Sequence, residues 1–302
     1  MVNPLCRRMK PHFHLIPRNL ENAYLTRHHI VPNLGTVWHY HPELELHYII
    51  RGKGVRFVGD NISNFDVGEL LLLGENLPHM WRCTEEYFRK DPSIQAEAIV
   101  VQFLPDFIGQ DFLQKWESEP ILRLYEKAKI GLVVTGDTKK QIIELMKQTV
   151  EAEGIKMIIL ILTMLEILSQ SKDLHPIASK QTLYQSSKEE TDRLNQVIAY
   201  ILNNYKNELT LEEISRVANL RTTSFCRYFK MMTKKTFRDF LIEIRISHAK
   251  RLLMENSELT TEAVGYECGF NNRSNFFRHF KAITGHTPSE YKREYAKESF
   301  LV

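Results

Sequence analysis

The alternation of apolar and polar positions divides this 302-residue chain into a strand-rich first part and a helical second part. From about residue 13 to residue 103, short apolar or alternating runs are separated by glycines, a pattern typical of strands joined by tight turns. The predicted strands are residues 47–51, 55–58, 69–73 and 96–103. Regular short strands of this kind favour a β-barrel or a β-sandwich.

Residues 105–170 change to the three-to-four spacing of helices. Short helices are predicted around residues 112–125, then a brief strand or turn at 132–134, then longer helices at 137–151 and 155–170. The last helix is apolar on nearly all sides, so it must be covered on more than one side. The sequence allows two explanations: a helix buried in the core, or a helix that also forms a dimer contact.

The polar stretch 171–189 loses this periodicity and predicts a linker between domains. An amphipathic helix at 192–204 then begins the C-terminal part. We therefore expect a strand-rich domain with appended helices at 1–170, the linker at 171–189, and an all-helical domain at 190–302.

The C-terminal part contains an internal repeat. Residues 210–220 align with residues 260–270 at an offset of fifty positions, and residues 224–230 align with residues 275–281 at an offset of fifty-one. Such a repeat indicates a duplicated supersecondary unit. Each copy predicts two helices around a short turn, the first of them capped by a threonine.

The second helix of each copy separates apolar from polar positions. The predicted inward residues are Phe225, Tyr228, Phe229 and Met232 in the first copy, and Phe276, Phe280 and Ile283 in the second. The predicted outward residues are Thr223, Cys226, Arg227 and Lys230, and then Arg273, Ser274, Phe277, Arg278 and Lys281. Short side chains followed by arginine suit the DNA major groove, where Arg can donate two hydrogen bonds to guanine.

The segment between the copies predicts one connecting helix over residues 237–254. A helix of that length extends about 27 Å, and successive major grooves on one face of B-DNA lie about 34 Å apart, so both second helices could enter neighbouring grooves. Residues 221–251 contain nine Lys or Arg against two Asp or Glu, although the whole chain has a net charge of only +3. This concentration of charge argues against the alternative of a plain helical bundle with a solvated basic face.

Residues 209–291 resemble the DNA-binding domain of the AraC/XylS family of transcription regulators. The resemblance is carried by Phe229-Lys230, residues 245–253, Gly269-Phe270, Phe276, Phe280-Lys281 and residues 285–291. Two positions depart from the family pattern. Lys234 replaces a helix-ending glycine, so it must adopt a left-handed backbone or the helix must end differently. Gly265 replaces an alanine, which is expected to cost the helix about 1 kcal/mol.

Matching to the family supports a division of the basic face into two sets of contacts. The residues expected at base edges are Thr223, Cys226, Arg227, Arg273, Ser274, Phe277 and Arg278. The residues expected at phosphates are Lys230, Lys234, Arg238, Asn272 and Lys281.

Two segments of the strand-rich part resemble the two cupin motifs. One contains His39, His41 and Glu45 followed by Gly52, and the other runs from Gly68 through Gly74 to Pro78-His79. The resemblance implies that His39, His41, Glu45 and His79 occupy the positions by which metal-binding cupins hold Fe, Mn, Zn or Ni. Two departures weaken it: only three residues separate Gly35 from His39, where the metal motif has five, and Gly74 and Asn76 replace a proline and a glycine.

The sensor domains of the AraC/XylS family typically bind an effector without a metal. In that case the same four side chains line an effector pocket, with Trp38, Tyr40, Tyr48 and Trp81 supplying stacking surfaces. A third alternative is that these residues are ordinary barrel core.

Composition adds little to this picture. The chain is 43% hydrophobic and 25% charged, as expected of a globular protein, and its pattern indicates neither a membrane-spanning nor a secreted protein. Its four cysteines have no disulfide or metal-site spacing, so reduced thiols in a cytoplasm are the simplest account.

Together these features predict an α+β protein: a cupin-like β-barrel with helices, then an all-helical domain with two helix-turn-helix motifs. The expected function is regulation of transcription rather than catalysis, with activation implied by the resemblance alone. The expected partners are promoter DNA, a small-molecule effector and a second copy of the chain, with RNA polymerase as a further candidate and a divalent metal as the candidate cofactor. Two alternatives are a metal-dependent cupin enzyme fused to a DNA-binding module, and an architectural DNA-binding protein without a ligand.

Overall fold

The computed structural model describes residues 24–35, 37–89, 91–179, 188–256 and 258–298. These form two compact units divided next to Asp192, and each unit is described by itself. The predicted start of the strand-rich part, near residue 13, lies outside the described residues.

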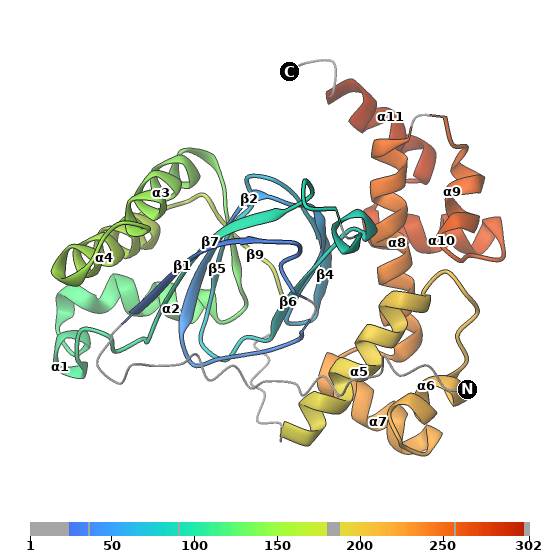
Figure 1. The fold of residues 1–302 in the computed structure, drawn as a ribbon, viewed down its shortest axis with the longest axis horizontal. Helices are drawn as coiled ribbons and strands as arrows, with labels where there is room; N and C mark the ends of the chain where they lie inside the picture. Colours follow the sequence, from blue (N-terminus) through green and yellow to red (C-terminus); the bar gives the residue numbers. More distant parts are fainter. Residues whose placement is uncertain (1–23, 36, 90, 180–187, 257, 299–302) are drawn as a thin grey trace. The chain divides into compact units, whose positions relative to one another are not determined.

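The first unit contains two sheets (Figure 1). The larger sheet has the strand order β1 (Tyr24–Val31), β7 (Ala96–Phe103), β2 (Leu44–Arg51), β5 (Leu70–Leu73), β8 (Leu132–Val134) and β9 (Leu174–Pro176). The smaller sheet has the order β4 (Asn61–Phe65), β3 (Gly54–Val58) and β6 (His79–Cys83).

Alternating side chains of the larger sheet enter two separate cores. Leu70 and Leu72 of β5 belong to the core under the helices, whereas Leu71 and Leu73 belong to the core shared with the smaller sheet. This is the period of two expected of a strand that is buried on both faces.

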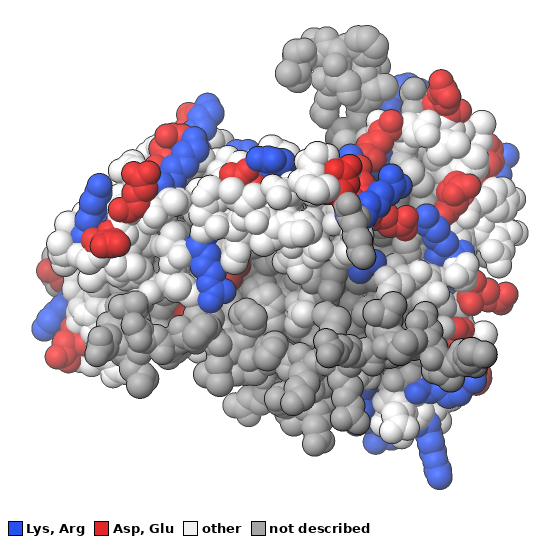
Figure 2. All heavy atoms as spheres, viewed as in Figure 1, with Lys and Arg blue, Asp and Glu red and all other residues white. Residues whose placement is uncertain are grey.

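Helices α2 (Glu119–Ala128), α3 (Gly136–Thr149) and α4 (Gly154–Gln170) cover the outer face of the larger sheet (Figure 1). The other helical segments of this unit are η1 (Glu85–Phe88), α1 (Gln110–Leu113) and η2 (Trp116–Ser118). Two ion pairs on α3, Lys140 with Asp137 and Lys147 with Glu144, each join residues three positions apart. Figure 2 shows basic and acidic side chains interspersed over this region.

The four predicted strands and the two longer helices are confirmed, whereas β1, β4 and β6 were not predicted. The prediction of a closed barrel is wrong, because the described strands form two open sheets. Packing two sheets face to face buries the same alternating side chains as closure would. The stretch 171–189, predicted as a linker, begins with β9 in the larger sheet and reaches α5 (Lys188–Asn204) at its end.

The second unit is helical, and the predicted pair of helix-turn-helix motifs is confirmed. The first motif consists of α6 (Leu211–Val217) and α7 (Thr222–Thr233), and the second consists of α9 (Thr261–Glu267) and α10 (Arg273–Thr284). Helix α8 (Phe237–Glu255) connects the two motifs, and α11 (Pro288–Glu298) follows the second. The repeat extends to the caps, since the side chains of Thr210 and Thr260 each accept a hydrogen bond from the backbone N–H three residues on.

Three local predictions have different outcomes. Lys234 has a φ of 59°, so it does adopt the left-handed backbone. The expected benefit of alanine at position 265 is wrong, because a Cβ atom on Gly265 would lie 2.7 Å from the ring of Phe276. Ile283 was expected to point inward but is 46% exposed. The ring of Tyr291, from α11, instead packs on Phe280 with the ring centroids 5.4 Å apart.

Among the helices of the described residues, none is both long and apolar enough to span a membrane.

Candidate functional site

The outward face of α7 is exposed as predicted. Its backbone orientation is fixed by Phe225 and Phe229, which are fully buried. The exposed residues at helical spacing are Thr223, Cys226, Arg227 and Lys230. This face therefore presents two cations and two short side chains to solvent.

The outward face of α10 differs from that of α7 at one residue. Arg273, Ser274 and Arg278 are exposed, but Phe277 is only partly exposed because it packs against Phe276. The guanidinium of Arg273 lies over the ring of Phe277 at 5.1 Å and also pairs with Glu262 at 3.1 Å. Arg273 must therefore exchange a protein partner before it can bind a base.

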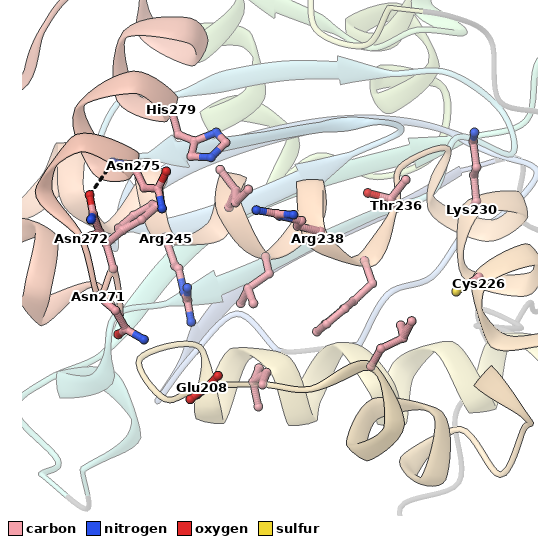
Figure 3. Close-up of a pocket in the computed structure, with 17 residues that line it drawn as sticks. Glu208, Cys226, Lys230, Thr236, Arg238, Arg245, Asn271, Asn272, Asn275 and His279 are labelled. Atoms are coloured by element: carbon pink, nitrogen blue, oxygen red, sulfur yellow. Dashed lines mark hydrogen bonds between the residues drawn. The ribbon is translucent and has the colours of Figure 1, made fainter. Parts of the chain in front are cut away.

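A groove of about 610 Å³ lies between the two motifs. Figure 3 shows Cys226 and Lys230 of α7 on one side, Asn272 and His279 on the other, and Arg238 of α8 between them. The groove thus brings together four residues expected to contact DNA, from elements far apart in the sequence. The other residues assigned to DNA, among them Lys234 and Lys281, do not line it, and all of them are exposed except Phe277, which is partly exposed.

Two features join the second motif to the turn that precedes the first. Arg245 of α8 donates from Nε to the carbonyl of Tyr205 and from Nη2 to the carbonyl of Asn207, each at 2.8 Å. Its guanidinium also lies 5.7 Å from the ring centroid of Phe270. Gly269, with a φ of 86°, approaches the same turn so closely that a Cβ would lie 2.8 Å from the Tyr205 oxygen. The turn 205–207 therefore holds the two motifs in one arrangement.

Two polar residues of the groove, Asn275 and His279, were not predicted from the sequence. Asn275 donates its backbone N–H to the side chain of Asn272 at 3.2 Å, which caps α10. Burial and then the charges of Arg278 and Arg238 lower the pKa of His279. His279 could have been found by comparing the two copies of the repeat, because it aligns with Tyr228, which is a buried apolar residue in the first copy.

The first unit has its own cluster of buried polar groups between the two sheets. His41 Nε2 lies 3.0 Å from Glu45 Oε2, and His79 Nε2 lies 3.8 Å from the same oxygen. One ligand atom each from His39, His41 and His79 lies within 4.8 Å of the others. The predicted set of three histidines and Glu45 is therefore brought together by the fold.

The tautomers of these three histidines are set by the backbone. Each Nδ1 lies next to a main-chain carbonyl two residues away: His39 to Val37 at 2.9 Å, His41 to Glu43 at 3.2 Å, and His79 to Leu77 at 2.8 Å. If Nδ1 donates, the Nε2 of neutral His79 has its lone pair available, which is the usual arrangement of a metal-binding histidine. The Nε2 of His41 instead lies 3.0 Å from Glu45 Oε2 and carries a proton while His41 is charged, which it would have to release before it could bind an ion. With that proton released, the residues present suit a divalent transition metal.

Two residues that the sequence did not indicate hold Glu45 in place. Gln102 Nε2 donates to Glu45 Oε2 at 2.7 Å, and His47 Nδ1 lies 2.8 Å from Glu45 Oε1. Gln102 faces Glu45 because β7 and β2 pair at these two residues. His47 could have been found from the sequence, since it follows Glu45 by two positions on the same face of a strand.

Burial and the neighbouring charges determine the protonation of this cluster. Burial acts to lower the pKa of His41, but hydrogen bonds with Glu43 and Glu45 outweigh it and raise the pKa to about 9. Burial acts to raise the pKa of Glu45, but His79 and the hydrogen bonds from His41 and His47 hold it well below its usual range. Burial, and then His39, lower the pKa of His79 well below its usual value. Glu45 is therefore ionised and His79 neutral at neutral pH.

The four aromatic residues expected around this cluster have different places. Trp81 stacks on His47 with ring centroids 3.9 Å apart, and Trp38 packs on Phe57. Tyr40 is partly buried. Tyr48 is a correction: it packs under the helices on the opposite face of β2 from Glu45, because it lies an odd number of residues away.

One departure from the cupin motifs is explained by the backbone. Asn76, at the place of a motif glycine, has a φ of 54°, and asparagine tolerates this left-handed region better than most residues. Its N–H donates to the carbonyl of His41 at 2.7 Å.

Residues 214–294 match the family model of a helix-turn-helix domain. A curated relative, an uncharacterised helix-turn-helix transcriptional regulator of Pseudoalteromonas carrageenovora, is 33% identical over 115 residues, which cover 36% of this chain and 68% of the relative. The chain belongs to the AraC-type helix-turn-helix transcriptional regulators.

Two further matches cover a smaller share of their own length or of this chain. The uncharacterised regulator YdeC of Bacillus subtilis is 33% identical over 109 residues, which cover 36% of this chain and 37% of YdeC. A crystal structure of the DNA-binding domain of AdpA, a global transcriptional factor, in complex with a target DNA is 27% identical, with a TM-score of 0.34, and covers 35% of this chain and 95% of that one. The part of this chain that matches YdeC thus covers less than half of YdeC.

Proposed function

We propose that this DNA-binding regulator recognises a bipartite promoter site through α7 and α10 and responds to a small-molecule effector held by its cupin-like first unit. The observation that carries the proposal is the pair of helices with basic outward faces, α7 and α10, on either side of one groove. Activation is the proposed direction of control, supported by the family resemblance. The names of the relatives as transcriptional regulators support regulation rather than catalysis as the role of the chain.

The proposed base contacts are those of the outward faces. Arg227 supplies a guanidinium for guanine, behind the short side chains of Thr223 and Cys226. The proposed phosphate contacts surround them: Lys230, Lys234, Arg238 and Lys281, with Asn272 at the start of α10, where backbone N–H groups favour an anion.

Replacing Arg227 by alanine is expected to cost about 1–3 kcal/mol of binding free energy and to relax the preference at one base pair. Lys281→Ala is the matched control, because loss of a phosphate contact should weaken binding to all duplexes alike and lower the salt slope by about 1. Titration of specific and random duplexes at several salt concentrations measures both effects. Equal losses on the two duplexes for Arg227→Ala would remove its proposed role.

We also propose that the first unit forms a homodimer through α4. Ile155 and Ile159 lie one helical turn apart on its outer side and are 71% and 57% exposed. The inner side of α4 is already in the core through Met157 and Ile161, which leaves the outer isoleucines as apolar surface that a partner would cover. A second copy of α4 presents the same apolar surface, and helices packed in this way form symmetric contacts.

Ile159→Lys is expected to convert a dimer to a monomer, because a lysine in this contact would be desolvated without a partner. Sedimentation velocity at several protein concentrations measures the association. Ile30→Lys is the control, since Ile30 is a 53% exposed isoleucine on β1 rather than on α4. Dimers that persist in the Ile159 variant would place the contact elsewhere.

A further inference from the structure

We infer that the groove between the two motifs is also a binding site for a small organic anion with an apolar body, and that such a ligand competes with DNA. The site goes beyond the proposed function, because it lies in the DNA-binding unit and not in the first unit. The competition rests on the proposed function, since it requires that a duplex cover the same groove. Three properties of the groove support the inference: its size, its apolar lining and its positive charge.

The groove has the size of a small-molecule site. Its volume is about 610 Å³, within the range of about 300–1,000 Å³ that is usual for pockets that bind organic ligands. It lies within the second unit alone, with α6 and α7 on one side, the second motif on the other and α8 between them (Figure 3). The hydrogen bonds of Arg245 link α8 to the turn before α6, so the groove is formed without a ligand.

A large part of the groove lining is apolar. Six of the lining side chains are leucine, isoleucine or phenylalanine: Leu209, Leu211, Phe237, Leu241, Ile242 and Phe270. Leu209, Phe237 and Ile242 are only partly buried, so part of their surface remains accessible. The phosphates and sugars of a duplex are bound mainly through hydrogen bonds and positive charge, so DNA alone does not explain this lining. An aromatic or aliphatic body would bury it.

Two cations at this groove have no protein partner. Lys230 of α7 and Arg238 of α8 are exposed, and neither side chain forms an ion pair or a hydrogen bond with any described residue. Figure 3 shows Arg238 between Lys230 on one side and His279 on the other. Glu208 is the single carboxylate among the described residues that line the groove, against Lys230, Arg238 and Arg245. The groove is therefore positively charged and attracts an anion.

Charge and lining together define the class of ligand. Arg238 can donate two parallel hydrogen bonds to a carboxylate or a sulfonate, while a ring or chain of the same molecule covers the apolar side chains. Asn271 and His279 line the same groove and can bond polar substituents of the ligand. Because Lys230, Arg238 and Asn272 are also the proposed phosphate contacts in this groove, the ligand and a duplex would use the same groups and exclude one another.

The test compares two fluorescent probes that have the same aromatic rings and differ in one anionic group. The probe 1-anilinonaphthalene-8-sulfonate has a sulfonate, whereas N-phenyl-1-naphthylamine is neutral. We expect the full-length protein to bind the sulfonate probe saturably and more tightly than the neutral probe. Arg238→Gln should weaken binding of the sulfonate probe by about tenfold, the effect of one hydrogen bond to a charged group, and leave binding of the neutral probe unchanged.

Two further variants separate the apolar contacts from general effects of charge. Leu209→Gln should weaken binding of both probes by at least about threefold, because it removes apolar surface from the groove. Arg216→Gln is the control, since Arg216 is exposed but does not line the groove. No saturable binding of the sulfonate probe, or equal affinities of the Arg238→Gln and Arg216→Gln proteins for it, would overturn the site.

The same probe tests the competition with DNA. A saturating random duplex should release the sulfonate probe from the wild-type protein. A probe that stays bound while the duplex is bound would overturn the competition. If the protein binds no duplex at all, the proposed function fails, whereas the probe titrations without DNA still test the site.

Discussion

Gly269→Ala is expected to lower the stability of the C-terminal unit by about 3 kcal/mol, the sum of two costs. A φ of 86° at this position penalises any residue with a Cβ by about 1–2 kcal/mol. The new Cβ would also lie 2.7 Å from the carbonyl oxygen of Lys206 and 2.8 Å from that of Tyr205, and overpacking of this kind costs about 1–3 kcal/mol. Backbone atoms cannot rotate away as a flexible side chain can.

Gly285→Ala separates these two costs. Gly285 has a similar φ of 80°, but nothing lies within 4 Å of its Cβ position, so only the backbone cost applies. Urea unfolding of the two variants should therefore show a clearly larger loss for Gly269→Ala. Equal losses would mean that the turn 205–207 moves aside freely, and the proposed rigid link between the motifs would then be wrong.

Arg245→Leu is expected to uncouple the two motifs. The variant keeps the apolar base of the side chain but loses the guanidinium and with it both hydrogen bonds to the turn 205–207, and hydrogen bonds to charged groups contribute about 1.5–3 kcal/mol each. Without them the second motif is no longer held in register with the first. Affinity for a bipartite site should then fall toward that for a single half-site.

The measurement compares binding to a bipartite duplex and to each half-site alone. Arg216→Leu is the control, because Arg216 is an exposed arginine at the end of α6 and should leave the ratio of the two affinities unchanged. An Arg245→Leu protein that keeps the wild-type ratio would show that α8 alone sets the spacing of the motifs.

The C-terminal unit could be predicted closely because each local signal has a local cause. Threonine caps, the turn glycine at position 269 and the apolar stripes of α7 and α10 depend on residues within a few positions. The two predictions that failed in this unit depended on tertiary contacts. Ile283 is exposed while Tyr291 of α11 packs on Phe280, and a Cβ on Gly265 would collide with the ring of Phe276. Neither neighbour could be placed from helical spacing alone.

The first unit was predicted less completely, because strand pairing determines which residues meet. The cupin resemblance indicated the three histidines and Glu45, but Gln102 joins them only through the register of β7 against β2. Register also places Tyr48 on the helical side of the sheet. The strand β9 was missed because its three residues carry no alternating pattern long enough to detect.

In the proposed function, both motifs bind one duplex. The most direct test is to incubate the purified full-length protein with fragmented genomic DNA of its source organism and to sequence the fragments that the protein retains. We expect a bipartite motif whose halves lie about 10 base pairs apart, one helical turn. Retained DNA with a single half-site, or with no shared motif, would contradict the claim.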